Sequence, residues 1–461
     1  MNPTKVLPGA LVENEERGWL LELDGHFDAP GSTSTLQPGG SSTLTWTSPE
    51  KFAILVGTTN QGKLISLVNC MVLGSSLPFG GSRGNLRLWP ESIIYGVHFE
   101  SIDDFRLTSL SVRYSNLDAW VATSGFDVKV GYEPYSVQIR YVQPASIESR
   151  VSDALSASID FAVSGPSLSA SSMISVVQQS WLTIKSNPGL PFNEILLRMN
   201  WLADFVSLGV GESLVPLEMS GSCNAQDQSG ATVSAQMELI YNRKPLASNR
   251  DDIASWEMLF TLNDIRPRFG DFIAAWFARD AALQSLYILH FGTIRSPSMH
   301  VEHRFLNLFQ AIESYDRRTV LPSSEELRRR SDRIERILTL VDGSDKQWLK
   351  RRLKQSNGPS AMDRIKRVVA NLKADWLLTP EDIALAADLR NYHTHFDPSL
   401  EQRLPPMDVR YRIMHNLAVR LRVLCELVLL TATGFSADDL RNRMERSRRV
   451  QRHLVDQSSS P

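Results

Sequence analysis

The spacing of apolar residues changes near the middle of the chain, and this change constrains the fold more than any single motif. In the first half, apolar residues recur at every second position, as in Val137, Ile139 and Tyr141, with Gly, Pro, Ser and Asn clusters between the runs. Such alternation is typical of half-buried β-strands. In the second half, the spacing over 301–315 and 413–428 is that of amphipathic helices. We therefore expect an α+β multidomain chain.

Charge and glycine content change at the same place. Residues 1–250 hold 16 Lys+Arg, 23 Asp+Glu and 21 of the 26 glycines, whereas residues 251–461 hold 33 Lys+Arg and 28 Asp+Glu. The polar segment Asn242–Asp252 is typical of a linker. We predict a β-rich domain at 1–250, resembling a sandwich or jelly roll and interrupted by one helix near 193–205. An all-α bundle at 251–456 and a disordered tail at 457–461 follow.

The overall composition excludes several classes of protein. A net charge of -2 excludes a uniformly basic nucleic-acid coat. The three cysteines form no paired motif, which favours a reducing cytoplasm. The first 17 residues contain no apolar run, and Glu426 interrupts the longest apolar patch, so we expect neither a signal peptide nor a transmembrane helix.

Gly57–Lys63 fits the phosphate-binding pattern G-x-x-x-x-G-K. However, Leu64 stands where that loop needs a hydroxyl, and the segment after it is rich in strand formers rather than helix formers. A β-hairpin turning at Asn60–Gly62 explains the same letters. A nucleotide-driven switch is the lesser alternative.

The sharpest candidate site lies at the end of a helix with a marked start. Thr379 can cap this helix and Pro380 suits its first position. Near its end, Asn391 and His395 lie one turn apart, with Arg390 beside them. The helix should stop at Asp397, because a proline follows.

These side chains suit the cleavage of RNA. An imidazole can transfer a proton near neutral pH, and a guanidinium can hold a phosphate and stabilise the charge that grows on it. No metal or cofactor is needed when the 2′-hydroxyl of the RNA is the nucleophile. The alternative is structural, because cations also suit the negative end of a helix dipole.

Several segments resemble one known family. Arg390-Asn391-x-x-x-His395 resembles the R-x(4–6)-H signature of HEPN ribonucleases, and Glu302–Tyr315 resembles the first helix of the HEPN domain in ApeA-type anti-phage proteins. Segments of the first half resemble the N-terminal domain of that family, in the expected order: Gly18-Trp19, 42–46, 56–63, 95–99 and 116–120.

The resemblance implies a homodimeric, metal-independent endoribonuclease of an abortive-infection system, whose first half senses a phage-derived trigger. In it, Arg390 would hold the scissile phosphate, His395 would be the general acid or base, and Asn391 would orient them. His393 offers a second, shorter spacing and would replace His395 if it faces the dimer interface. The main rival is a non-catalytic protein that binds RNA or a partner.

Two other features carry weaker hypotheses. His300 and His303 lie on adjacent turns, as metal ligands sometimes do, but no third ligand is evident and a solvated helix start is favoured. Residues 321–376 hold 14 Lys+Arg and 8 Asp+Glu, and residues 441–452 hold six arginines. Such runs are usually solvated helix faces, but here they can also hold an RNA backbone.

Overall fold

The protein was analysed as a computed structural model, which describes residues 5–25, 27, 33–36, 42–45, 51–76, 84–103, 105–170, 173–226, 231–242, 253–320, 323–356 and 358–447. Its contacts divide the chain into two units. The sheet unit comprises Met1–Ala203 and Leu214–Ile253, and the helical unit comprises Asp204–Ser213 and Ala254–Pro461. All of the expected linker after Asn242, and the expected tail at 457–461, lie outside the described residues.

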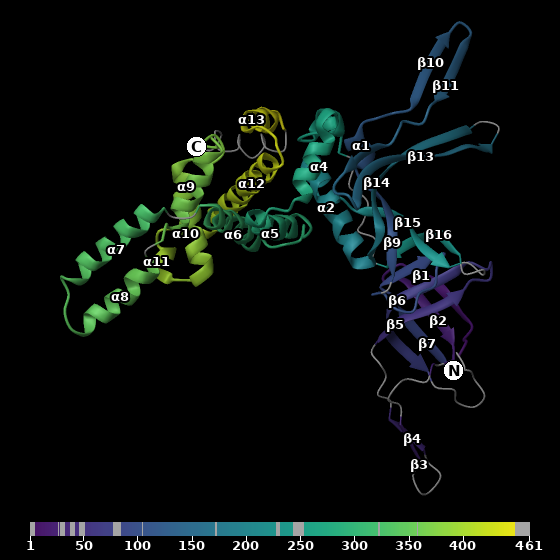
Figure 1. The fold of residues 1–461 in the computed structure, drawn as a ribbon, viewed down its shortest axis with the longest axis horizontal. Helices are drawn as coiled ribbons and strands as arrows, with labels where there is room; N and C mark the ends of the chain where they lie inside the picture. Colours follow the sequence, from purple (N-terminus) through teal and green to yellow (C-terminus); the bar gives the residue numbers. More distant parts are fainter. Residues whose placement is uncertain are drawn as a thin grey trace. The chain divides into compact units, whose positions relative to one another are not determined.

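The sheet unit is built on one large antiparallel sheet (Figure 1). Among the described residues, its strand order is β1-β2-β7-β6-β8-β16-β15-β9-β14-β13-β12, and β5 pairs with β6. These strands are β1 (Gly9–Asn14), β2 (Gly18–Asp24), β5 (Lys51–Thr58), β6 (Leu64–Ser76), β7 (Asn85–Trp89), β8 (Ser92–Tyr95), β9 (Arg106–Tyr114), β12 (Ile147–Arg150), β13 (Leu155–Ala170), β14 (Met173–Pro191), β15 (Pro216–Gln226) and β16 (Thr232–Tyr241). The predicted β-rich first half is confirmed.

Two hairpins stand apart from this sheet: β3 (Thr33–Leu36) with β4 (Ser42–Thr45), and β10 (Phe126–Tyr132) with β11 (Tyr135–Tyr141). Two helices belong wholly or partly to the sheet unit, α1 (Leu117–Val121) and α2 (Phe192–Val210). The expected helix at 193–205 is therefore confirmed and is longer than predicted. Its first half buries Ile195, Met199 and Leu202 at helical spacing.

The segment Gly57–Lys63 is a hairpin, so the nucleotide-loop alternative is wrong. The Thr59 amide donates to the Lys63 carbonyl and the Gly62 amide donates to the Thr59 carbonyl, both at 2.9 Å. Strand β6, rather than a helix, follows the turn. The Lys63 ammonium pairs with Glu238 at 3.1 Å and lies 4.7 Å from the centre of the Tyr95 ring. The Lys63 ammonium therefore contacts residues of the sheet and does not point into a phosphate-binding loop.

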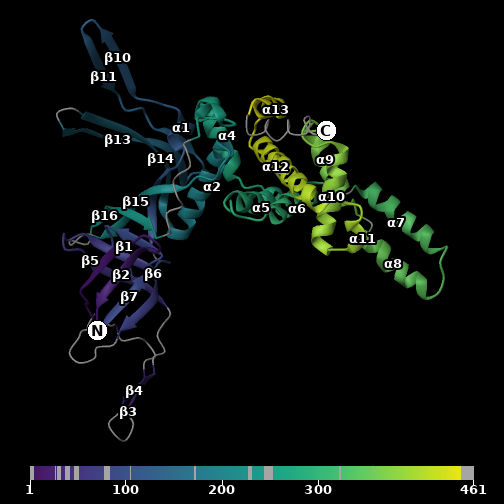
Figure 2. The ribbon, with the colours of Figure 1, turned by 180° about the vertical axis from the view of Figure 1, so that it is seen from behind.

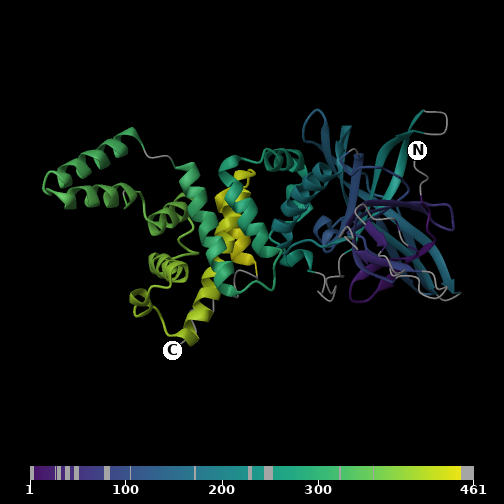
Figure 3. The same cartoon turned by 90° about the horizontal axis from the view of Figure 1, so that it is seen from below.

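The helical unit follows the predicted periodicity. Its helices are α3 (Leu262–Ile265), α4 (Phe269–Phe277), α5 (Gln284–Ile294), α6 (Val301–Thr319), α7 (Ser324–Leu338), α8 (Ser344–Ser356), α9 (Ala361–Asn371), α10 (Pro380–His395), α11 (Pro398–Glu401), α12 (Met407–Ala432) and α13 (Ala437–Arg446), with 3-10 turns at Ser255–Glu257, Arg266–Arg268 and Ala281–Leu283. Figure 3 shows α12 lying along α5 and α6. Helices α7 and α8 form an antiparallel hairpin at one end of the unit (Figure 2).

The apolar side chains of the central helices are more deeply buried than those of the α7–α8 hairpin. On α6, Val301, Phe305 and Leu308 are at most 4% exposed, as their stripe predicts. On α7, Leu327 is 53% exposed and Leu338 is 8% exposed, so the apolar residues of this helix are only partly buried. The three cysteines of the chain are free and buried. Within the described residues, every helix is too short or too polar to cross a membrane.

Candidate functional site

Helix α10 begins and ends as its sequence predicts. The Thr379 hydroxyl accepts from the Asp382 amide at 3.2 Å, and the Asp382 carboxylate accepts from the Thr379 amide at 3.0 Å. This reciprocal capping box satisfies two backbone donors at the start of the helix. At its end, Phe396 takes a left-handed conformation with φ of 49°, so His395 is the last helical residue. The candidate residues thus lie on the last two turns of a firmly delimited helix.

The guanidinium of Arg390 is fixed from two sides. Its Nη2 atom donates to Oε2 of Glu313 on α6 at 3.1 Å, and its Nη1 atom donates to Oδ1 of Asn391 at 3.2 Å. The Arg390 side chain remains 30% exposed. The structure therefore brings Arg390 and Asn391 together, with two of the five guanidinium donors engaged by these contacts. The remaining donors of this partly exposed guanidinium can reach a phosphate.

Glu313 is the residue of this site that the sequence pattern missed. Its side chain is 9% exposed, and its second oxygen, Oε1, accepts from Arg317 at 2.7 Å. A carboxylate at such a buried position needs cationic partners to remain charged. The available signal was its place four residues after the buried Phe309, on the inner face of an amphipathic helix.

The two histidines have different surroundings. His395 is exposed, and no hydrogen bond links it to Arg390 or Asn391 within the described part of the chain. His393 is half-buried, with the rings of Tyr392 and Phe396 centred 5.1 and 6.1 Å away. Burial lowers the pKa of His393, an effect that nearby Arg410 strengthens and Glu302 opposes. Its Nε2 atom is buried and has no hydrogen-bond partner among the described residues.

The histidines considered as metal ligands lie at the start of α6. His300 precedes the first helical residue and is exposed, and its ring centre lies 6.2 Å from that of His303. In the described ranges, no group of three or more His, Cys, Asp or Glu side chains is placed to hold a metal ion.

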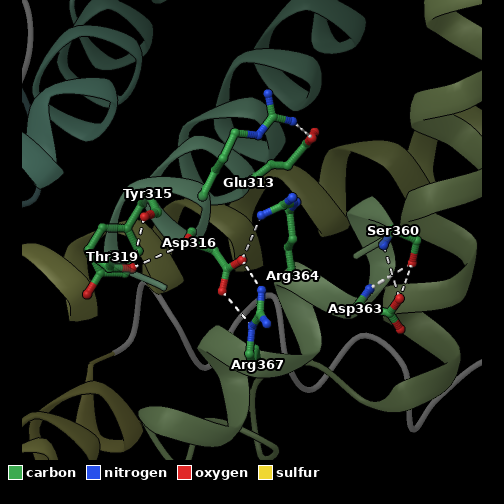
Figure 4. Close-up of polar contacts among 9 residues, drawn as sticks. Glu313, Tyr315, Asp316, Thr319, Ser360, Asp363, Arg364 and Arg367 are labelled. Carbon is green, nitrogen blue, oxygen red and sulfur yellow. Dashed lines mark hydrogen bonds and ion pairs between the residues drawn. The ribbon is translucent and has the colours of Figure 1, made fainter. Parts of the chain in front are cut away.

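In the two basic segments, 321–376 and 441–452, several arginines pair with carboxylates of the helical unit. Asp316 on α6 is fully buried and accepts from Arg364 at 3.2 Å and from Arg367 at 2.9 and 2.5 Å (Figure 4). These bonds hold α9 against α6. In the last segment, Arg443 bonds to Asp264 and Asp439, which is a structural arrangement. Residues 448–452 lie outside the described residues.

Comparison with protein families identifies both halves of the chain. The model of ApeA N-terminal domain 1 matches residues 2–276, and the model of Apea-like HEPN matches residues 306–439. The second match includes Glu313, Arg390, Asn391 and His395. Neither the curated proteins nor the solved structures include a match to the chain.

Proposed function

The chain belongs to the ApeA family, as an anti-phage protein of the HEPN nuclease type, and from this premise we propose that it cleaves RNA without a metal ion at a site formed by Arg390, Asn391 and His395. The HEPN family is generally one of ribonucleases. The proposal therefore concerns the active residues, the mechanism and the assembly.

One observation carries the proposal. The guanidinium of Arg390, whose side chain is 30% exposed, is oriented by Glu313 and Asn391, and it lies five residues before an exposed imidazole on the same helix. A guanidinium fixed before substrate binds loses little conformational freedom when it holds a phosphate. An exposed imidazole can exchange protons with a bound substrate.

The proposed reaction is an internal transfer. The 2′-oxygen of a ribose attacks the adjacent phosphorus, an O2′–P bond forms, and the P–O5′ bond breaks. A base takes the proton of the 2′-hydroxyl and an acid gives a proton to the departing 5′-oxygen. His395 is proposed as one of these groups, and Arg390 stabilises the charge on the phosphoryl oxygens. The products are a 2′,3′-cyclic phosphate and a 5′-hydroxyl.

A second copy of the chain would complete the site. Large exposed apolar side chains flank the motif: Phe396 is 66% exposed, Met407 71% and Tyr411 59%. The start of α12 adjoins the end of α10, because the Arg410 guanidinium lies 5.1 Å from the centre of the Tyr392 ring. Exposed apolar groups of this size favour a protein interface. They support a homodimer in which the two motifs share one cleft.

The other parts of the proposal concern regulation and location. The sheet unit would sense a phage-derived trigger, and the reaction would take place in the cytoplasm, which agrees with three unpaired cysteines.

The rival function is RNA or partner binding without catalysis. The pairing of Arg390 with a buried carboxylate favours it, because such a pair can be purely structural.

Cleavage assays separate the two functions. The purified full chain, His395→Ala and His393→Ala are incubated with single-stranded RNA in excess chelator. We expect His395→Ala to lower the cleavage rate by about 10²–10⁴-fold, the usual contribution of a general acid or base, and His393→Ala to have a much smaller effect. Equal rates for His395→Ala and the parent would reject His395, and a large loss in His393→Ala alone would assign the role to His393. No cleavage by the parent would leave the rival open, because the assay does not contain the proposed trigger.

A further inference from the structure

A pocket rich in arginine lies between α6, α7 and the start of α9. Its volume is about 180 Å³, and it is lined by Arg317, Val320, Arg330, Gly358, Pro359, Arg364 and Arg367. Among the described residues, no carboxylate lines this pocket. This volume far exceeds the roughly 10–15 Å³ that one water molecule needs, so the pocket can admit a phosphate group. Four of the seven lining residues are arginines, which favours an anionic ligand.

The inner wall of the arginine pocket is fixed before any ligand binds. The buried carboxylate of Asp316 holds Arg364 and Arg367, whose side chains are only 12% and 33% exposed (Figure 4). Gly358 lies against this wall, since a Cβ atom there would be 3.8 Å from Nη2 of Arg364. The Arg364 donors that Asp316 does not use are held in place, so they can bind an anion with little reordering.

The arginine pocket is connected to the candidate catalytic arginine through one side chain. Glu313 accepts from Arg317, which lines the pocket, at Oε1, and from Arg390 at Oε2. The two guanidiniums are thus separated by a single carboxylate. Across the whole cluster, five guanidiniums face two carboxylates, Glu313 and Asp316, which leaves an excess of positive charge.

We propose that the arginine pocket holds a backbone phosphate of the RNA substrate, next to the phosphate bound at Arg390. The inference rests on the proposed ribonuclease function. An RNA strand carries one phosphate for each nucleotide, so the scissile phosphate has a neighbouring phosphate on each side along the strand. A strand that places its scissile phosphate at Arg390 therefore brings a neighbouring phosphate toward Arg317 and the pocket. The pocket positions the strand and does not take part in bond breaking.

Salt-dependent RNA binding tests this role without requiring cleavage. Binding of single-stranded RNA to full-length His395→Ala protein is measured in chelator over a range of salt concentrations. The test variant adds Arg330→Gln, because Arg364 and Arg367 also hold buried Asp316 and their loss would destabilise the fold. The control adds Arg329→Gln, which removes the same charge from a neighbouring side chain that is 74% exposed and pairs with Glu325. Thermal unfolding of both variants is followed to show that they remain folded.

We expect Arg330→Gln to weaken binding roughly tenfold and to reduce the slope of log K against log salt by about 0.7, the value for one phosphate contact on a single strand. Arg329→Gln should change both quantities much less. Equal slopes for the two variants, or no RNA binding by the parent, would overturn the proposal. A reduced slope, with wild-type and His395→Ala proteins cleaving RNA at equal rates, would support the pocket and reject the proposed catalytic site. Cleavage with an unchanged slope would do the reverse.

Discussion

Two carboxylates on α6, Glu313 and Asp316, lie three residues apart and each binds two guanidiniums, yet their surroundings differ. The Asp316 side chain is fully buried, and both of its arginines are largely covered. The Glu313 side chain is 9% exposed, but Arg317 is 63% and Arg390 30% exposed. The Asp316 carboxylate is therefore closed off from solvent, whereas the Glu313 cluster is open to solvent through Arg317; Arg367 and Arg390 are exposed to a similar extent.

This difference in exposure shows how one helix, α6, can contribute both to stability, through Asp316, and to the candidate site, through Glu313. A closed cluster contributes to folding, because removing one member leaves a buried charge without a partner. An open cluster fixes the direction of a guanidinium while leaving donors for a ligand. Four variants test whether these roles are as separate as the structure indicates.

The largest effect is expected on the free energy of unfolding when the closed cluster at Asp316 is disrupted. Asp316→Asn keeps the shape of the side chain but leaves two partly buried guanidiniums without their counter-charge. We expect it to lower the free energy of unfolding by about 3–5 kcal/mol, or on the order of 10 °C in melting temperature. The matched control is Glu325→Gln, which breaks an exposed pair with Arg329 and should cost less than about 1 kcal/mol. Similar melting temperatures for the two variants would contradict the closed cluster.

The next effect is on cleavage. Arg390→Ala removes the guanidinium that we propose stabilises the phosphoryl oxygens, so we expect the cleavage rate to fall by about 10²–10³-fold. Arg390→Lys should restore only part of the rate, because an ammonium cannot make the same forked contact. An unchanged cleavage rate in Arg390→Ala would show that this arginine has a structural role only.

Glu313→Gln tests whether Glu313 orients the Arg390 guanidinium; the substitution leaves the guanidinium that would contact the substrate in place. The amide keeps one acceptor but loses the charge that holds Arg390 and Arg317. We expect cleavage to fall about tenfold through misplacement of Arg390, with a smaller change in stability than in Asp316→Asn. Rates and melting temperatures measured on the same preparations check this order. The reverse order would make Glu313 the structural carboxylate.

The smallest effect concerns pH and a third buried carboxylate of the helical unit. Burial raises the pKa of Asp204 to about 6, although Arg295 and Arg279 oppose this rise. In the unfolded chain the pKa is about 3.9. The native carboxyl therefore holds its proton more tightly, and the stability it contributes is full below about pH 4 and lost as the pH rises through about 6. Melting curves should show Asp204→Asn gaining stability relative to wild type over this range, whereas a constant difference would contradict the raised pKa.

Local patterns predicted local structure well. The cap at Thr379, the end of helix α10 before Asp397 and the hairpin at Gly57–Lys63 depend on neighbouring residues, and the sequence contained all of them. The division into a β-rich and a helical half followed from apolar periodicity in the same way.

Long-range contacts could not be predicted in this manner. Glu313 and Arg390 are 77 residues apart, and their pairing depends on how α6 and α10 pack. The strand order of the sheet has the same cause, since non-neighbouring strands such as β9 and β15 pair. In the proposed homodimer, the choice between His393 and His395 depends on which side chain faces the second copy, and this too is a long-range property that helical spacing does not encode.

The chemistry of the RNA ends tests the central claim most directly. RNA fragments produced by the purified full chain in excess chelator are analysed at both new ends. Metal-independent attack by the 2′-hydroxyl predicts 2′,3′-cyclic phosphate and 5′-hydroxyl ends, which His395→Ala does not produce. Fragments with 5′-phosphate ends, or cleavage that stops when the chelator is added, would contradict the claim and indicate a metal-activated water instead.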